Sequence, residues 1–139
     1  QRELLRPIIE KEALAFAVAQ VSPQEIDAIN ILKASFKAMH KAIDNLQVKP
    51  ALLLIDGNRF TPYLGIAHEC VIKGDGKYAA IAAASILAKT YRDDFMYAAH
   101  QDYPHYKWNE NKGYPTKAHK ALIAAHGLTP LHRVTFKYT

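Results

Sequence analysis

The chain has 139 residues, of which 50% are hydrophobic and 22% charged, and this composition excludes a disordered or fibrous protein. Its longest apolar stretch, around Ala79 to Ala88, is far shorter than the roughly 20 residues that a membrane span needs. A net charge of +5 favours a polyanionic partner. The single cysteine, Cys70, and the lack of a signal-peptide pattern at Gln1-Arg2-Glu3 suit the cytoplasm. We expect one globular, cytoplasmic, monomeric domain over residues 1–139.

Two helices are predicted before residue 47. The apolar residues of the first recur at helical spacing, with Pro7 in the first turn or at a kink: Ile8, Ile9, Ala13 and Phe16. The segment Ser22-Pro23-Gln24-Glu25 is typical of a capping box with proline at the first helical position. From there we expect one continuous helix to about Leu46, where Lys49-Pro50 stops it.

Two short strands follow, each closed by a glycine-containing turn. The apolar run Ala51–Ile55 precedes Asp56-Gly57-Asn58 and is typical of a central strand buried on both faces. A second strand is predicted at His68–Lys73, before Gly74-Asp75-Gly76.

The rest of the chain is predicted to be helical apart from one loop. Small and apolar residues at helical spacing predict a long helix from Tyr78 to about His100. The stretch Gln101–Pro115, rich in Tyr, Pro and Asn, indicates a loop, and Thr116–His126 a last helix that ends at Gly127.

Two carboxylates, Asp56 and Asp75, each follow a predicted strand beside a glycine. Both side chains can therefore meet at one edge of the sheet, where open α/β sheets bind ligands. Clustered carboxylates suit hard cations such as Mg²⁺ or Mn²⁺. The competing interpretation is that Asp-Gly is simply a good turn dipeptide.

The second half of the chain mixes basic and aromatic residues, a combination that suits a phosphate backbone. The histidines lack the spacing of a zinc site. His119 lies on the apolar side of its predicted helix, near Leu122 and Ile123. At such a position a hydrogen-bonded core residue is expected more often than a catalytic one.

Four segments carry a resemblance to a known family. They are Leu54-Ile-Asp-Gly-Asn58, Val71-Ile-Lys-Gly-Asp75, Ala82-Ala-Ala-Ser-Ile-Leu-Ala-Lys89 with Arg92-Asp93, and Lys112-Gly-Tyr-Pro-Thr-Lys-Ala-His119. Because these four segments occur in the order and at about the spacing found in that family, the chain resembles ribonuclease HII, the type 2 ribonuclease H.

The resemblance implies an α/β fold: a ribonuclease H-like core, here with a partial sheet, with packed helices and a C-terminal helical extension. It implies an endonuclease that cuts the RNA strand of RNA-DNA hybrids, and duplex DNA on the 5′ side of embedded ribonucleotides. Two Mg²⁺ or Mn²⁺ ions serve the reaction in this family, which leaves 5′-phosphate and 3′-hydroxyl ends.

The resemblance also implies roles for individual residues. Asp56 and Asp75 match the third and fourth of four catalytic, metal-binding carboxylates. Tyr114 matches a tyrosine that stacks and hydrogen-bonds at the 2′-hydroxyl beside the cut. The remaining nucleic-acid contacts are assigned to Asn58, Ser85, Lys89 and Arg92. The alternative for the last three is that they only satisfy the helix surface.

One departure from the family matters for activity. The first two carboxylates of the family are an adjacent Asp-Glu pair on its first strand, and this sequence has no Asp-Glu pair. We therefore expect the chain to be N-terminally incomplete and inactive alone. Two other interpretations stay open: a non-catalytic nucleic-acid-binding fragment, and another ribonuclease H-like phosphoryl-transfer nuclease. The Gly-Tyr-Pro-Thr-Lys-Ala-His run argues against the second.

Overall fold

The computed structural model describes residues 1–133 and divides into two compact units. One contains Gln1–Gln20 and Ser35–Thr90, and the other contains Val21–Ala34 and the chain from Tyr91 onward. The predicted mixed α/β class, with a small parallel sheet and packed helices, is confirmed. Within residues 1–133, no helix is long and apolar enough to cross a membrane. The single domain expected over 1–139 stays a prediction.

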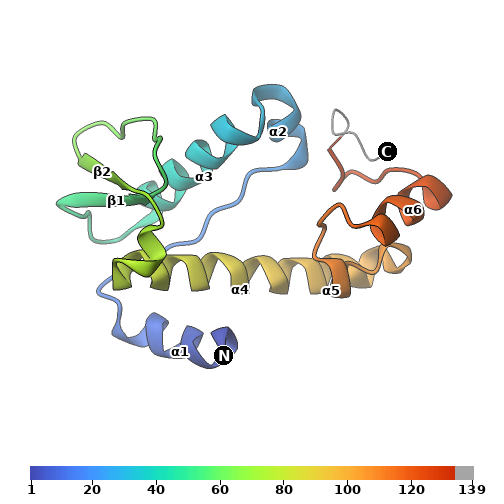
Figure 1. Cartoon of the computed structure of the whole chain (residues 1–139), viewed down its shortest axis with the longest axis horizontal. Coiled ribbons are helices and arrows are strands. Elements are labelled where there is room, and N and C mark those ends of the chain that lie inside the picture. Colours follow the sequence, from blue (N-terminus) through green and yellow to red (C-terminus); the bar gives the residue numbers. More distant parts are fainter. Residues whose placement is uncertain (134–139) are drawn as a thin grey trace. The chain divides into compact units, whose positions relative to one another are not determined.

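The first unit contains both strands of the described sheet. β1 (Leu52–Asp56) and β2 (Ala67–Val71) pair in parallel, with Leu52 opposite Ala67 and Asp56 opposite Val71. Both predicted strands are thus confirmed, although β2 begins one residue earlier and ends two residues earlier than expected. The carboxyl ends of the two strands share one edge of the sheet (Figure 1).

The expected burial of β1 on both faces is wrong for the described structure. Leu53 and Ile55 are buried, but Leu52 is 48% exposed. Successive side chains of a strand point to opposite faces, and only one face packs into the unit's apolar cluster, against Ile43. That residue belongs to α3 (Ile31–Asn45).

The helix expected to run unbroken from residue 22 to 46 is two helices, α2 (Pro23–Ile29) and α3. Its start is as predicted, because Ser22 Oγ accepts a hydrogen bond from the Glu25 backbone N–H. The break is at Asn30, whose φ is +75°, a region that Asn tolerates better than most residues. Asn30 N–H donates to Ile26 O and its side-chain oxygen accepts from Lys33 N–H. One residue therefore ends the first helix and caps the second.

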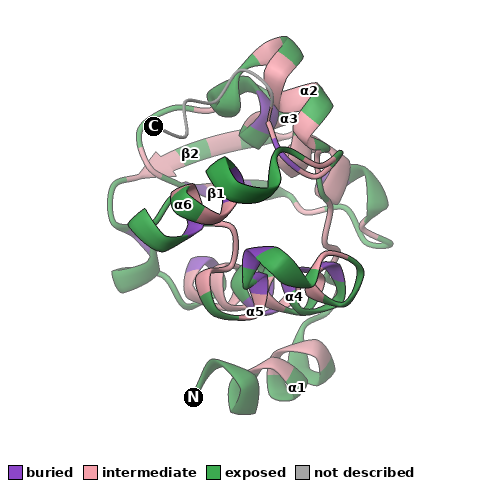
Figure 2. Ribbon diagram, turned by 90° about the vertical axis from the view of Figure 1, so that its right-hand side faces the viewer, coloured by how far each residue is buried: buried purple, intermediate pink, exposed green. Residues whose placement is uncertain are grey.

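α1 (Arg2–Glu12) confirms the first predicted helix, with Pro7 inside it. It ends before Phe16, because Ala13 is extended with ψ 138°. None of its residues is buried, and Figure 2 shows only exposed and half-buried colours along it.

The long helix is α4 (Ala79–Asp102), close to the predicted bounds. The segment expected to be a loop, Gln101–Pro115, is partly helical: it contains a 3₁₀ turn, η2 (Pro104–Tyr106), and the short helix α5 (Trp108–Asn111). Burial explains this difference. The Tyr106 and Trp108 rings stack 5.1 Å apart inside the second unit's apolar cluster, with Met96, Ala99 and Ile123.

The last helix, α6 (Lys117–His126), begins one residue later than predicted and ends at the predicted residue. Thr116 Oγ1 caps it by accepting from His119 N–H, and Gly127 terminates it with φ +81°. Glycine adopts this φ without steric cost.

Candidate active site

The first group of candidate residues lies at the carboxyl edge of the β1–β2 pair. Asp56 is the last residue of β1, and Gly57 N–H extends the ladder by donating to Val71 O at 2.9 Å. Asp56 is exposed, and its Oδ1 accepts a hydrogen bond from Gly74 N–H at 2.9 Å. The carboxylate is therefore held toward the turn that follows β2.

That turn is η1 (Gly74–Gly76), and Asp75 is its middle residue. Gly74 is buried, and a Cβ added there would lie 2.6 Å from Ile81 Cδ1 and 3.5 Å from Asp56 Oδ1. Only a residue without a side chain fits this position unchanged. The exposed Asp75 is therefore the next residue in the sequence after Gly74, whose amide binds Asp56. Both acidic residues belong to one short stretch of the sheet edge.

Gly74→Ala should destabilise the protein, because the new methyl group would overlap Ile81 Cδ1. Overpacking of this kind costs about 1–3 kcal/mol. Ile81→Val removes Cδ1, so the Gly74→Ala cost should be smaller in an Ile81→Val background. Urea unfolding of the four variants measures this coupling. An equal cost of Gly74→Ala in both backgrounds would show that Ile81 is not the obstacle.

The chemistry of this pair fits a hard divalent cation. Mg²⁺ is commonly bound by one or two carboxylates together with waters and substrate phosphates. Within residues 1–133, no group of three or more His, Cys, Asp or Glu side chains is arranged to hold a metal. Asp56 and Asp75 therefore suit part of a cation site, and their role as ligands stays a prediction.

Three other predicted residues lie on the same unit. Asn58 is exposed in the turn after β1. On α4, Ser85 is half-buried and Lys89 exposed. Because Ser85 and Lys89 are four residues apart, they share one face of the helix. Their contacts with nucleic acid stay predictions.

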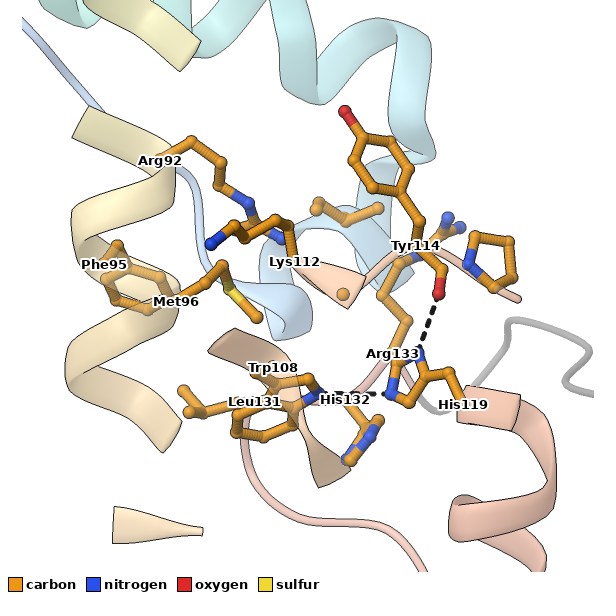
Figure 3. Close-up of a pocket in the computed structure, with 13 residues that line it drawn as sticks. Arg92, Phe95, Met96, Trp108, Lys112, Tyr114, His119, Leu131, His132 and Arg133 are labelled. Carbon is orange, nitrogen blue, oxygen red and sulfur yellow. Dashed lines mark hydrogen bonds between the residues drawn. The ribbon is translucent and has the colours of Figure 1, made fainter. Parts of the chain in front are cut away.

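The second group, Arg92 and Tyr114, lies on the other unit. Both line a cavity of about 280 Å³, and Figure 3 shows Arg92 reaching from α4 toward the loop that carries Lys112 and Tyr114. The other lining residues are Ile26, Phe95, Met96, Trp108, Gly113, Pro115, His119, Leu131, His132 and Arg133. Gly113 brings the loop close to α4: an added Cβ would lie 3.1 Å from Arg92 Nη2 and 3.2 Å from Met96 Cε.

Positive charge gathers at this cavity. Burial lowers the pKa of Arg92, while Tyr114 and Asp93 act in the opposite direction, and a guanidinium stays protonated at neutral pH. Lys112 Nζ lies 3.5 Å from the centre of the Tyr97 ring, a cation–π contact. The side chains of Arg92 and Lys112 thus place positive charge at the cavity, which favours an anionic ligand.

His119 is a buried, hydrogen-bonded residue, as predicted. Its Nε2 accepts from Trp108 Nε1–H at 3.1 Å and its Nδ1 lies 2.9 Å from Tyr114 O, the two dashed bonds of Figure 3. Burial, and secondarily His119, lower the pKa of the neighbouring His132. Neither Trp108 nor His132 was a candidate from the sequence; the available signal was a tryptophan within a polar stretch.

Comparison with known proteins agrees with this architecture. The crystal structure of ribonuclease H2 from Pyrococcus horikoshii superposes with a TM-score of 0.80, covering 99% of this chain and 72% of that chain at 24% identity. The fold is thus that of the ribonuclease H2 proteins.

The sequence comparisons are more specific. The family model for ribonuclease HII matches residues 1–139. The ribonuclease HII of Bacteroides thetaiotaomicron is 68% identical over 136 residues, which are 98% of this chain and 68% of the relative. That of Phocaeicola vulgatus is 64% identical with the same coverage. The chain belongs to the ribonuclease HII family, which confirms the resemblance drawn from the four sequence segments.

Proposed function

We propose that this chain forms the larger part of a metal-dependent endonuclease that cuts the RNA strand of RNA-DNA hybrids and duplex DNA on the 5′ side of embedded ribonucleotides. One observation carries the proposal: in a member of the ribonuclease HII family, Asp56 and Asp75 lie at the carboxyl edge of a parallel strand pair. A carboxylate pair at such an edge suits phosphodiester hydrolysis assisted by divalent cations.

Asp56 and Asp75 would hold Mg²⁺ or Mn²⁺ together with the scissile phosphate. When bound, such ions activate the attacking water and stabilise the leaving 3′ oxygen. The role of the surrounding protein would be to hold the metal-binding carboxylates in position. Gly74 N–H orients Asp56 through its hydrogen bond, and the tight packing of Gly74 against Ile81 fixes that amide.

Recognition of the ribonucleotide is assigned to Tyr114. The residue is 68% exposed, and a phenol can both stack on a nucleotide and hydrogen-bond a 2′-hydroxyl. Arg92, Lys89, Ser85 and Asn58 would contact the backbone, where positive and hydroxyl or amide groups bind phosphate oxygens.

Because the chain holds only two of the carboxylates that the proposal needs, its activity should differ from that of a full-length protein. This chain corresponds to 68% of the B. thetaiotaomicron relative, so a full-length protein can be made by joining it to the uncovered segments of that relative. The full-length protein should cleave a labelled hybrid in Mg²⁺ or Mn²⁺ and stop in EDTA. The 139-residue chain alone should be inactive, because two carboxylates leave much of a two-ion site without ligands. Cleavage in EDTA, or equal rates for both proteins, would refute the metal-site assignment.

The basic side chains of α4 should contribute to affinity without specificity. Lys89→Ala and Arg92→Ala in the full-length protein should each weaken hybrid binding and lower the salt-dependence slope by roughly 0.9 per lost phosphate contact. Lys11→Ala, at an exposed position in the last turn of α1, is the matched control. Fluorescence anisotropy at several salt concentrations gives the slopes. If both slopes equal that of the control, these side chains do not contact phosphate.

A further inference from the structure

We propose that His119 is a positioning residue for Tyr114: a single neutral tautomer, selected by Trp108, fixes the backbone from which the Tyr114 phenol projects. The inference deepens the proposed function and rests on it through the role of Tyr114. It concerns residues of one compact unit only.

The tautomer of His119 follows from its partner. An indole N–H can only donate a hydrogen bond, so His119 Nε2, 3.1 Å from Trp108 Nε1, must be the acceptor. The ring proton of the neutral imidazole is then on Nδ1. Nδ1–H donates to Tyr114 O at 2.9 Å. Trp108 and His119 are each 2% exposed, so water does not compete for either bond.

The loop around Tyr114 is fixed on both sides of the residue. Tyr114 N–H donates to Asn111 O at 2.9 Å, and Tyr114 O also accepts from Thr116 N–H at 2.8 Å. Asn111 is itself bound, because its Oδ1 accepts from Gly113 N–H and its Nδ2 donates to Tyr106 O. The His119 bond ties the Tyr114 carbonyl itself to a buried side chain of the unit.

In contrast to the hydrogen-bonded backbone of the loop, the side chain of Tyr114 is exposed. Figure 3 shows its ring directed away from His119 while its carbonyl oxygen points at the imidazole. The residue as a whole is 68% exposed, so packing does little to orient its ring and the backbone must. Displacing a group that positions substrate by about 1 Å can cost about 10²-fold in rate.

Two substitutions separate the two bonds of the imidazole. The amide nitrogen of asparagine occupies nearly the position of His Nδ1, so His119→Asn keeps a donor for Tyr114 O and loses the acceptor for Trp108. Glutamine reaches nearly to the position of Nε2, so His119→Gln keeps an acceptor for Trp108 and loses the donor. Both variants lose one buried hydrogen bond, and similar melting temperatures should result.

In the full-length protein, with duplex DNA containing one ribonucleotide as substrate, His119→Gln should lower kcat by about 10- to 100-fold with little change in KM. His119→Asn should remain within about threefold of the wild-type rate. A merely structural role predicts equal losses for both, in proportion to their stability, and that result would overturn the proposal.

A double-mutant cycle with Tyr114→Ala gives the second readout. If His119 acts by positioning Tyr114, His119→Gln should cause no further loss of kcat once the phenol is absent. An equal loss in both backgrounds would mean that His119 acts elsewhere. If Tyr114→Ala itself keeps the wild-type rate, the assigned role of Tyr114 fails, and the positioning role fails with it. A large effect of Tyr114→Ala beside a wild-type rate for His119→Gln would remove only the positioning role.

Discussion

Replacing Asp56 with asparagine in the full-length protein should lower the rate of hybrid cleavage by about 10²- to 10³-fold or more, the scale on which one group that stabilises transition-state charge acts. The substitution is nearly isosteric. An asparagine side-chain oxygen can still accept from Gly74 N–H, the bond that Asp56 Oδ1 makes at 2.9 Å. What is lost is the negative charge that we propose holds a cation, so binding of the hybrid should change little.

Single-turnover cleavage and anisotropy on the same hybrid measure these two effects separately. Asp75→Asn should act in the same direction. Asp102→Asn, at an exposed position at the end of α4, is the matched control and should keep the wild-type rate. Normal turnover of Asp56→Asn in saturating Mg²⁺ would make Asp56 an ordinary turn residue.

Tyr114→Ala should have the second large effect, on substrates with a single ribonucleotide. Sites built to hydrogen-bond a hydroxyl can discriminate against its absence by about 10⁴- to 10⁵-fold, so the alanine variant should lose far more turnover than binding. Because Tyr114 is 68% exposed, its removal leaves no buried cavity, and the melting temperature should change little.

Tyr114→Phe separates stacking from hydroxyl recognition. Stacking alone predicts that phenylalanine keeps most of the activity, whereas recognition of the 2′-hydroxyl by the phenol predicts a rate between wild type and alanine. We expect the intermediate rate. Wild-type rates for both variants would show that Tyr114 only packs its loop.

Elements that depend on local interactions could be predicted from the sequence, whereas those that depend on single-residue backbone geometry or on tertiary contacts could not. β1, α4 and α6 are specified by local patterns, and their bounds were close to those expected. The break at Asn30 was missed because it depends on one residue with φ +75° that serves two helices. The partial helicity of Gln101–Pro115 was missed because the stacking of Tyr106 on Trp108 is a tertiary contact.

The same distinction applies to the candidate site. The position of Asp56 and Asp75 at one edge follows from two strands ending in Asp-Gly turns, provided that the strands are parallel, as they are. The Gly74 amide that orients Asp56 is not visible in the sequence, since the bond joins residues 18 apart. The Trp108–His119–Tyr114 chain of hydrogen bonds likewise joins side chains from two helices to a backbone carbonyl of the loop between them.

The proposed activity can be measured by mapping the cut ends on a duplex DNA with one embedded ribonucleotide. For the full-length protein in Mg²⁺ or Mn²⁺, we predict one cut on the 5′ side of the ribonucleotide, leaving a 3′-hydroxyl on one product and a 5′-phosphate on the other. Cyclic phosphate ends, or equal cutting of the same duplex made entirely of DNA, would contradict the proposed metal-assisted cleavage at ribonucleotides.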